Sequence, residues 1–409
     1  MPVFLYASGL PPQGMVLDKT YVLAVAARGF NHHTPVDGFP RPPVSCHFSH
    51  HAAKSSSEKV KSYPQAVHDF KQLRRSKSGL NVFEVMPLQD SCVGHDVTPF
   101  ALSQMIQLGE YLAERYKYVF PTLHHAGKDM VLASSMPEQD YFQSTMALLH
   151  GLLNEKQFMR VSMKKLESDV VRGAWSHSWC PSIRDIEIFV QKAYTDEHQI
   201  FKNKEAGFMP QKSLLESLGV RKLQPTKEVI QSLSHWFCDT SSIPCNHEKC
   251  INLTESAASQ MLQLIAMHNS YLSANEVFQA YSLADTYIHF EKLLSWFDDG
   301  EASSDQVIKV DVVDDFFFLK VLATLGHEAQ DPILPGARLV IEQYKKEKSK
   351  SSVKFWRVLV DGKVVTESLQ VCSGAASKGF CSVATVKVRL KRLAETNMFG
   401  VCTKSRDEL

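Results

Sequence analysis

An uninterrupted apolar segment near the N-terminus predicts a buried strand. Residues 21–27 are apolar throughout, and the run ends at Arg28 and Gly29. A short run of this kind is typical of a parallel strand that is buried on both faces and delivers a loop at its carboxyl end. Ligands of open α/β sheets bind at such ends, so the residues after this strand are the first place to look for chemistry.

Helical patterns follow the first strand. Thr98 and Pro99 provide an N-cap and a first helical residue, and apolar residues recur behind them at three-and-four spacing up to Tyr116. A strand is expected at 130–134 and a second helix at 139–153. Strand and helix alternate here as in a doubly wound sheet. The polar stretch from His50, weakly periodic as far as Leu80, is interpreted as a surface excursion.

The second half of the chain returns to strands after a helical interval. Between about 172 and 300 only helical patterns occur, including 226–237 and 254–272. Strand patterns resume at 307–313, 337–344 and 353–360, and Asp361-Gly362 then predicts a hairpin turn. We therefore expect an α/β core domain built from 1–171 and 301–409, with a mainly parallel, doubly wound sheet. Residues 172–300 are expected to form an inserted helical cap.

Composition limits the classes of partner. The chain has 409 residues, 44% of them hydrophobic and 22% charged, and a net charge of +1 at pH 7. This is an ordinary globular composition. It lacks the basic surplus that nucleic acid attracts, so nucleic acid is not expected as a partner.

The cysteines favour an oxidising compartment. Six of the nine fall in two tight sets: Cys238, Cys245, Cys250 and Cys372, Cys381, Cys402. Clustering of this kind favours disulfides in the secretory pathway, and it does so over a zinc site made by Cys245, His247 and Cys250. Because nine is an odd number, one thiol stays free or pairs with another chain. Asn252 begins a glycosylation sequon, which agrees with this compartment.

The termini bear on localisation. Residues 3–10 are too short an apolar stretch for a signal peptide or a membrane span, so processing or an anchor upstream of this chain is expected. The last four residues belong to the Lys-Asp-Glu-Leu class of retrieval signals and are expected to engage a retrieval receptor: Arg406, Asp407, Glu408 and Leu409. The predicted location is the lumen of the endoplasmic reticulum or Golgi.

Three segments, in this order and spacing, resemble the histidine acid phosphatases. Residues 27–35 stand after the first strand, where the family has Arg-His-Gly-x-Arg-x-Pro. Residues 131–152 are similar to the arginine-bearing strand, loop and helix of the family, and residues 312–342 are similar to its Ser-Ala-His-Asp segment and the strand that follows. The cysteine sets and residues 177–181 look most like the 2-phosphoxylose phosphatase branch. The resemblance implies phosphomonoester hydrolysis without a cofactor, in which a histidine attacks phosphorus, arginines hold the phosphate and an aspartate protonates the leaving alcohol.

The first motif departs from this pattern. No alignment places a histidine at the nucleophile position, which falls on Arg28, Gly29 or Phe30. The second arginine of the motif falls on Asn31, His32 or His33. One alternative is that His32 or His33 has moved into the nucleophile position through a longer loop, with Arg28 as the phosphate-binding cation. Two others are that both histidines are exposed loop residues, or that they bind a metal ion with Asp37, for which no fourth ligand is evident.

The other two motifs lose positive charge. The phosphate-binding arginine of the second becomes Asp140, and the histidine of the His-Asp pair becomes Asp314. Asp315 keeps the proton-donor position, and Arg28, if buried, would need Asp314 or Asp315 as a partner. We therefore expect a pseudophosphatase that binds a glycan or a protein partner, with no metal. The alternative is an active phosphomonoesterase acting on 2-phosphoxylose in the proteoglycan linkage glycan, or a general acid phosphatase.

Overall fold

The computed structural model describes most of the predicted core of the chain. The described residues are 14–27, 45–75, 92, 94–117, 131–136, 138–159, 161, 163–165, 188, 245, 250–251, 254–298, 307–346 and 353–398. Most of the 172–253 interval lies outside this set, so the division into a core and a helical cap stays a prediction.

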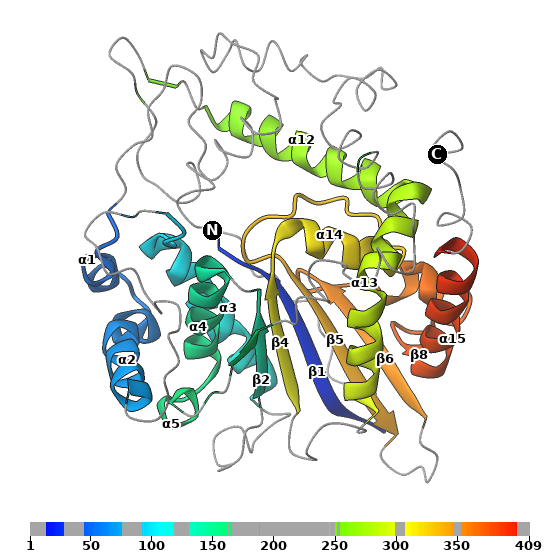
Figure 1. Cartoon of the computed structure of the whole chain (residues 1–409), viewed down its shortest axis with the longest axis horizontal. Coiled ribbons are helices and arrows are strands. Elements are labelled where there is room, and N and C mark those ends of the chain that lie inside the picture. Colours follow the sequence, from blue (N-terminus) through cyan, green and yellow to red (C-terminus); the bar gives the residue numbers. More distant parts are fainter. Residues whose placement is uncertain are drawn as a thin grey trace.

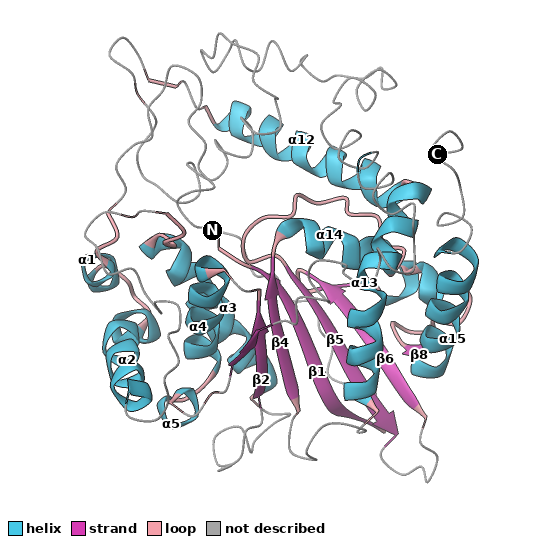
Figure 2. Cartoon of the chain, in the orientation of Figure 1, coloured by secondary structure: helices cyan, strands magenta, loops and turns pink. Residues whose placement is uncertain are grey.

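A single mixed sheet forms the centre of the molecule (Figures 1 and 2). Its strand order is β3-β2-β4-β1-β5-β6-β7, and β8 pairs with β6. The strands are β1 (Met15–Val25), β2 (Val131–Ser135), β3 (Met163–Lys165), β4 (Ile308–Val313), β5 (Arg338–Lys346), β6 (Lys354–Val360), β7 (Lys363–Val364) and β8 (Cys381–Ser382). The strands from β3 to β1 pair in parallel, whereas β5, β6, β7 and β8 make antiparallel pairs. The α/β class is confirmed, as is the return of the C-terminal half to complete the sheet.

Helices cover both faces of this sheet. The described helices are α1 (Phe48–Ala53), α2 (Glu58–Arg75), α3 (Pro99–Tyr116), α4 (Gln139–Leu152), α5 (Glu155–Phe158), α12 (Glu255–Ala274), α13 (Glu276–Phe297), α14 (Asp315–Thr324) and α15 (Val383–Leu393). Short 3₁₀ segments at Thr366–Ser368 and Gln370–Cys372 precede α15, and a π-helical turn at Ala394–Met398 ends the described chain.

Alternate side chains of β1 divide the core into two layers. Val22 and Ala24 join the apolar cluster that packs under α2, α3 and α4. Tyr21 and Leu23 join the opposite cluster, formed with α13, α14 and α15. This period-two alternation is the property of an extended strand that is buried on both faces. Because α13 contributes Phe290 and other side chains to the second cluster, it belongs to the packed core.

The predicted helix starts are confirmed at two N-caps. Thr98 Oγ1 accepts a hydrogen bond from the backbone N–H of Ala101 at 3.3 Å, directly before Pro99. Thr254 Oγ1 caps α12 by accepting from the N–H of Ala257 at 3.1 Å. Each cap satisfies a backbone donor that the first turn would otherwise leave without a partner.

The prediction of a surface excursion between residues 50 and 80 is wrong. This stretch contains α2, which buries Val60, Tyr63 and Val67 against the core. The buried positions recur at three- and four-residue spacing, the period of an amphipathic helix. Ser55-Ser56-Ser57 and Pro64 obscure this pattern in the sequence, although Ser57 Oγ accepts from the N–H of Val60 at the start of the helix.

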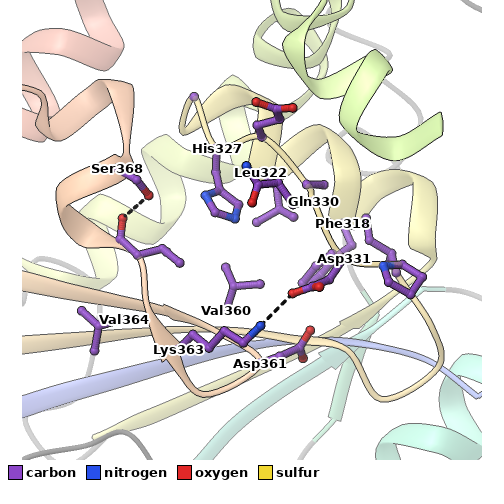
Figure 3. A pocket seen from close by; sticks show the side chains of 16 residues that line it. Phe318, Leu322, His327, Gln330, Asp331, Val360, Asp361, Lys363, Val364 and Ser368 are labelled. Atoms are coloured by element: carbon purple, nitrogen blue, oxygen red, sulfur yellow. Dashed lines mark hydrogen bonds and ion pairs between the residues drawn. The ribbon is translucent and has the colours of Figure 1, made fainter. Parts of the chain in front are cut away.

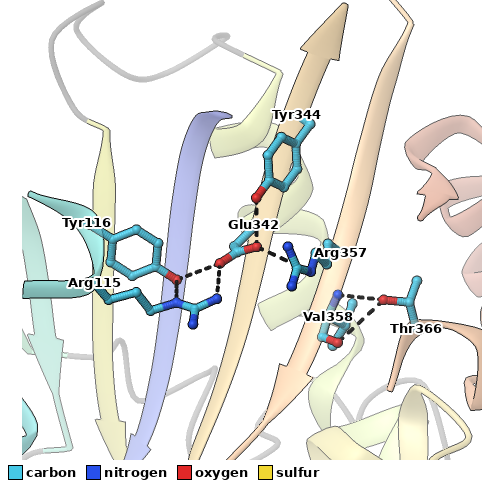
Figure 4. A network of polar contacts seen from close by, with 7 residues as sticks. All are labelled: Arg115, Tyr116, Glu342, Tyr344, Arg357, Val358 and Thr366. Carbon is cyan, nitrogen blue, oxygen red and sulfur yellow. Dashed lines mark hydrogen bonds and ion pairs between the residues drawn. The ribbon is translucent and has the colours of Figure 1, made fainter. Parts of the chain in front are cut away.

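A buried ion network ties α3 to the antiparallel part of the sheet (Figure 4). Glu342 on β5 accepts hydrogen bonds from Arg115 at 2.8 Å, from Tyr116 at 2.9 Å and from Tyr344 at 2.9 Å. Arg357 Nε on β6 lies 3.8 Å from the same carboxylate. Burial, with the carboxylate close by, raises the pKa of Tyr116 and of Tyr344. The charge of Glu342 is therefore satisfied within the core.

Three disulfides join described cysteines. Cys245 pairs with Cys250 and Cys372 pairs with Cys381, which confirms disulfide use in each of the two predicted sets. Cys46 pairs with Cys92, a bond that the clustering did not indicate. Three disulfides are typical of a protein of the secretory pathway or the cell exterior. Within the described ranges, no helix is both long enough and apolar enough to cross a membrane.

Candidate functional site

The carboxyl ends of three parallel strands meet at one edge of the sheet. Ala26, just past the end of β1, donates its N–H to the carbonyl of Val313 at 2.9 Å. Met136, past the end of β2, donates to the carbonyl of Val312 at 3.3 Å. Helices α4 and α14 begin directly after β2 and β4, so their N-termini lie at this edge (Figure 1). Helix N-termini favour anions, because their first N–H groups have no partner within the helix.

Two aspartates stand at the start of α14. Asp314 is the N-cap, and its Oδ1 accepts from the backbone N–H of Phe317. Asp315 is the first helical residue and is half-buried. Asp315 therefore lies at the carboxyl edge, and the proton-donor role that the resemblance implies for it stays a prediction. The capping carboxylate satisfies one of the N–H groups that an anion would otherwise bind.

A third aspartate occupies the start of α4. Asp140 is only 1% exposed, and its Oδ1 accepts from the N–H of Tyr141 at 3.2 Å. The imidazole Nδ1 of His95, a half-exposed residue just before α3, lies 3.9 Å from the same oxygen. Asp140, which the resemblance aligns with an arginine of the family, is thus a buried carboxylate with a histidine beside it, and that alignment stays a prediction.

Polar side chains of α4 fix this edge in place. Ser144 Oγ donates to the carbonyl of Asp140 at 2.7 Å and lies 3.2 Å from the carbonyl of Ala27. Gln143 Oε1 accepts from the N–H of Val97 at 2.9 Å. The Gln-Ser pair of the second motif thus joins α4 to the end of β1 and to the segment before α3.

Sequence reasoning did not single out His95 or Asp96. Asp96 is buried, and its Oδ1 accepts from Nε2 of Gln139 at 2.9 Å. The available signal was their position directly before the Thr98 N-cap, at the opening of a helix that packs on α4. Their contact partners are more than forty residues away in the chain, which a local pattern does not reveal.

Several predicted site residues lie outside the described part of the chain. They are Arg28, His32, His33, Asp37, His247, Asn252 and the C-terminal residues Arg406 to Leu409. Among the described residues, no group of three or more histidine, cysteine, aspartate or glutamate side chains could hold a metal ion. Cys245 and Cys250, the two cysteines that the zinc alternative would use as ligands with His247, form a disulfide.

The described charged groups at the two helix starts are mainly acidic. Asp140, Asp314 and Asp315 are acidic, and His95 is the one described group beside them that could become cationic. Lys320, further along α14, is bound to Asp285 at 2.6 Å and is buried. A phosphate dianion at these helix starts would meet carboxylates where a phosphatase needs fixed positive charge.

A separate pocket of about 530 Å³ lies at the other end of α14 (Figure 3). Phe318 and Leu322 line its apolar side, and the imidazole of His327 faces its interior. Lys363 and Asp331 form an ion pair of 3.0 Å beside it. Burial lowers the pKa of His327. The pocket extends along α14 from Phe318 to the loop after the helix, and neither Asp314 nor Asp315 lines it.

Solved structures of phosphatases are similar to this chain over its whole length. A phytase of Hafnia alvei matches with a TM-score of 0.58 at 11% identity, covering 97% of this chain and 100% of the phytase. A Klebsiella phytase matches with a TM-score of 0.55 at 14% identity, over 94% and 96% of the two chains. A multiple inositol polyphosphate phosphatase of Bifidobacterium longum, in complex with inositol hexasulfate, matches with a TM-score of 0.54 at 10% identity, over 100% and 97%.

Sequence comparison alone finds no relative. No protein-family model matches the chain, and no curated protein does. At 10 to 14% identity the structural matches show the fold, and they leave the 2-phosphoxylose branch untested. The chain thus has the fold of the histidine acid phosphatases.

Proposed function

We propose that this protein is a pseudophosphatase of the secretory pathway that binds a glycan or a protein partner at the carboxyl edge of its sheet. The observation that carries the proposal is the presence of Asp140 and Asp314 at the starts of α4 and α14. Both helix N-termini that could receive a phosphate already hold a carboxylate. The three disulfides support the compartment.

Electrostatics makes phosphate binding at this edge costly. Two unit charges 4 Å apart interact by about 4 kcal/mol at an effective dielectric constant near 20. A helix N-terminus returns only about 0.3–1 kcal/mol to an anion. A phosphate dianion beside Asp140 and Asp314 would therefore bind weakly unless a carboxylate were protonated or a cation lay nearby.

The lost side chains weaken catalysis further. Removing one oxyanion-binding group typically lowers kcat by about 10² to 10³ fold. In this sequence the nucleophile, a phosphate-binding arginine and the histidine of the His-Asp pair are all replaced at their aligned positions. Together these changes support a binding role in place of turnover.

The retained Asp315 favours a second candidate, an active phosphomonoesterase. Its place at the start of α14 suits a group that protonates a leaving alcohol. In this case His32 or His33 would supply the nucleophile and Arg28 would bind the phosphate. The candidate substrates are 2-phosphoxylose in the proteoglycan linkage glycan, from the sequence resemblance, and inositol phosphates, from the solved structures of similar fold.

Turnover assays separate the two candidates. Purified protein is assayed from pH 4 to 7 on an aryl phosphate, a 2-phosphoxyloside and inositol hexakisphosphate, beside His32→Ala, His33→Ala and Asp315→Ala. Asp331→Asn, an exposed carboxylate near the separate pocket, is the matched control. The proposal predicts no turnover above a mock preparation with any substrate. Turnover that disappears in one histidine variant and in Asp315→Ala, but survives in Asp331→Asn, would return the protein to the enzymes.

A further inference from the structure

The outer face of α15 carries a dense basic patch. Lys387, Arg389, Lys391 and Arg392 lie within six consecutive residues, and the helix contains no acidic residue. On a helix with 3.6 residues per turn these four positions spread over the half of the surface that faces away from the core. The core-facing half is made by Val383, Val386 and Leu390, which are buried.

The patch is accessible in the described structure. The side chain of Lys391 is 72% exposed and its Nζ lies 4.0 Å from the exposed carboxylate of Glu395, while Val388, between the basic positions, is 67% exposed. Arg392 is also exposed. Lys387 forms an ion pair with Asp298, and Arg389 donates a hydrogen bond to the carbonyl of Gln370 at 3.3 Å, so both side chains are held in place. The ends of the patch are thus held in place while its centre is open to solvent.

The surrounding segment adds to this charge. Residues 353–398 contain eight basic and three acidic residues, whereas the whole chain has a net charge of only +1. Three of these cations have acidic partners, because Arg357 lies beside Glu342, Lys363 pairs with Asp331 and Lys387 pairs with Asp298. The remaining positive charge is concentrated on α15, at Arg389, Lys391 and Arg392. Such a concentration attracts polyanions even on a protein that is neutral overall.

The side chains on the outer face of α15 indicate which class of partner fits it. A specific protein interface needs buried aromatic or large apolar anchors, and Val388 is the one large apolar side chain among these exposed positions. Insertion into a membrane surface needs an exposed apolar helix face, but that face of α15 is packed against the core. Disulfides indicate a compartment without nucleic acid. A sulfated or carboxylated polysaccharide, recognised by charge and without an apolar anchor, fits what remains.

We infer that the outer face of α15 is a binding surface for an acidic polysaccharide, centred on Lys391 and Arg392. Ammonium and guanidinium groups form charge-assisted hydrogen bonds with sulfate and carboxylate groups. Binding also releases the counterions condensed on the polymer, which makes the affinity fall as salt rises. The inference is independent of what happens at the carboxyl edge, because α15 is at the opposite side of the sheet from α4 (Figure 1).

Heparin is the probe, measured by affinity chromatography and by titration calorimetry at several salt concentrations. The test variant is Lys391→Ala with Arg392→Ala, and the control, with the same loss of charge, is Lys54→Ala with Lys61→Ala, at the end of α1 and on α2. Alanine is a good helix former, so both variants should fold, which thermal unfolding checks. A further variant, Val388→Glu, places a negative charge at the centre of the patch without removing a cation.

The inference predicts that the wild type binds heparin at 0.15 M salt and that the α15 double variant binds at least tenfold more weakly. The affinity of the double variant should also depend less steeply on salt: the slope of log affinity against log salt should be smaller in magnitude than that of the wild type by about one to two, as expected for about two lost charge contacts. Val388→Glu should also weaken binding, and the control variant, Lys54→Ala with Lys61→Ala, should bind as the wild type does. The inference is overturned if the wild type does not bind heparin, if both double variants lose affinity equally, or if only anionic vesicles bind.

Discussion

The Nδ1 atom of His95 lies 3.9 Å from Oδ1 of Asp140, across the start of α4. This contact joins a half-exposed imidazole to a carboxylate that is almost fully buried. The resemblance aligns Asp140 with an arginine of the histidine acid phosphatases, and this alignment stays a prediction. The contact places an acidic and a titratable side chain together at the carboxyl edge of the sheet.

The crossing of α3 and α4 depends on two glycines. A Cβ atom on Gly109 would overlap the carbonyl oxygen of Leu148, and one on Gly151 would overlap that of Ile106. We predict that Gly109→Ala or Gly151→Ala lowers the free energy of unfolding by about 3 kcal/mol or more, because backbone atoms must separate. Urea denaturation checks this. Gly336→Ala, which has open space but a positive φ, is the control and should cost about 1 kcal/mol; equal losses at all three positions would contradict the close crossing.

Helix boundaries were predictable where the local chemistry and the apolar pattern agree. Thr98 and Pro99 define the start of α3 without any tertiary information, and the Asp361-Gly362 turn has positive φ at both residues, as its sequence predicts. The start of α2 was not predicted, because serines and Pro64 suggest a loop while its buried stripe is set by packing. The contact of His95 with Asp140 depends on how α3 and α4 pack, which no local pattern encodes.

Acid should destabilise the protein through two buried histidines. Burial lowers the pKa of His150 and of His289 to about 4. In the unfolded chain both titrate near 6.5. As the pH falls from 6.5 to 4 the unfolded state therefore takes up protons that the folded state refuses, and stability falls by up to about 1.4 kcal/mol per pH unit for each residue.

Chemical denaturation at pH 7 and pH 4.5 measures this loss. His289→Gln keeps an acceptor for the hydroxyl of Tyr21, which lies 2.8 Å from the ring nitrogen, but it does not titrate. His150→Gln keeps an amide N–H that can donate to the carbonyl of Lys59, which lies 3.0 Å from the ring nitrogen. Each variant should show a smaller difference in stability between the two pH values than the wild type. An unchanged difference would show that these histidines do not carry the pH dependence.

Two of the disulfides close loops of different length and should therefore differ in how much they stabilise the fold. Cys46 and Cys92 are 46 residues apart in sequence, and Cys372 and Cys381 are 9 apart. Loop-closure entropy predicts that paired alanine substitution costs about 4 kcal/mol for the first and about 2.5 kcal/mol for the second. Urea denaturation of the two double variants gives the order, and non-reducing peptide mapping of the wild type verifies the pairs. A larger loss at the short loop would contradict this explanation.

Glu342 should be one of the most sensitive positions in the core. It accepts three hydrogen bonds and lies 3.8 Å from Arg357. Glu342→Ala leaves Arg115 and Arg357 buried without this carboxylate, so we predict a loss of about 3–5 kcal/mol in the free energy of unfolding. Glu342→Gln keeps the acceptor and should cost less. If Glu342→Ala unfolds at the same denaturant concentration as the wild type, this network does not contribute to stability.

Phosphate binding is the most direct test of the central claim, that carboxylates at the helix starts exclude phosphate. Inorganic phosphate is titrated at pH 7 into the wild type and into Asp140→Asn with Asp314→Asn, which keep similar shape and the capping acceptor. The account predicts no measurable binding to the wild type at millimolar phosphate, and a gain in affinity of at least about tenfold in the double variant. Sub-millimolar binding by the wild type that is unchanged or weakened in the double variant would contradict it.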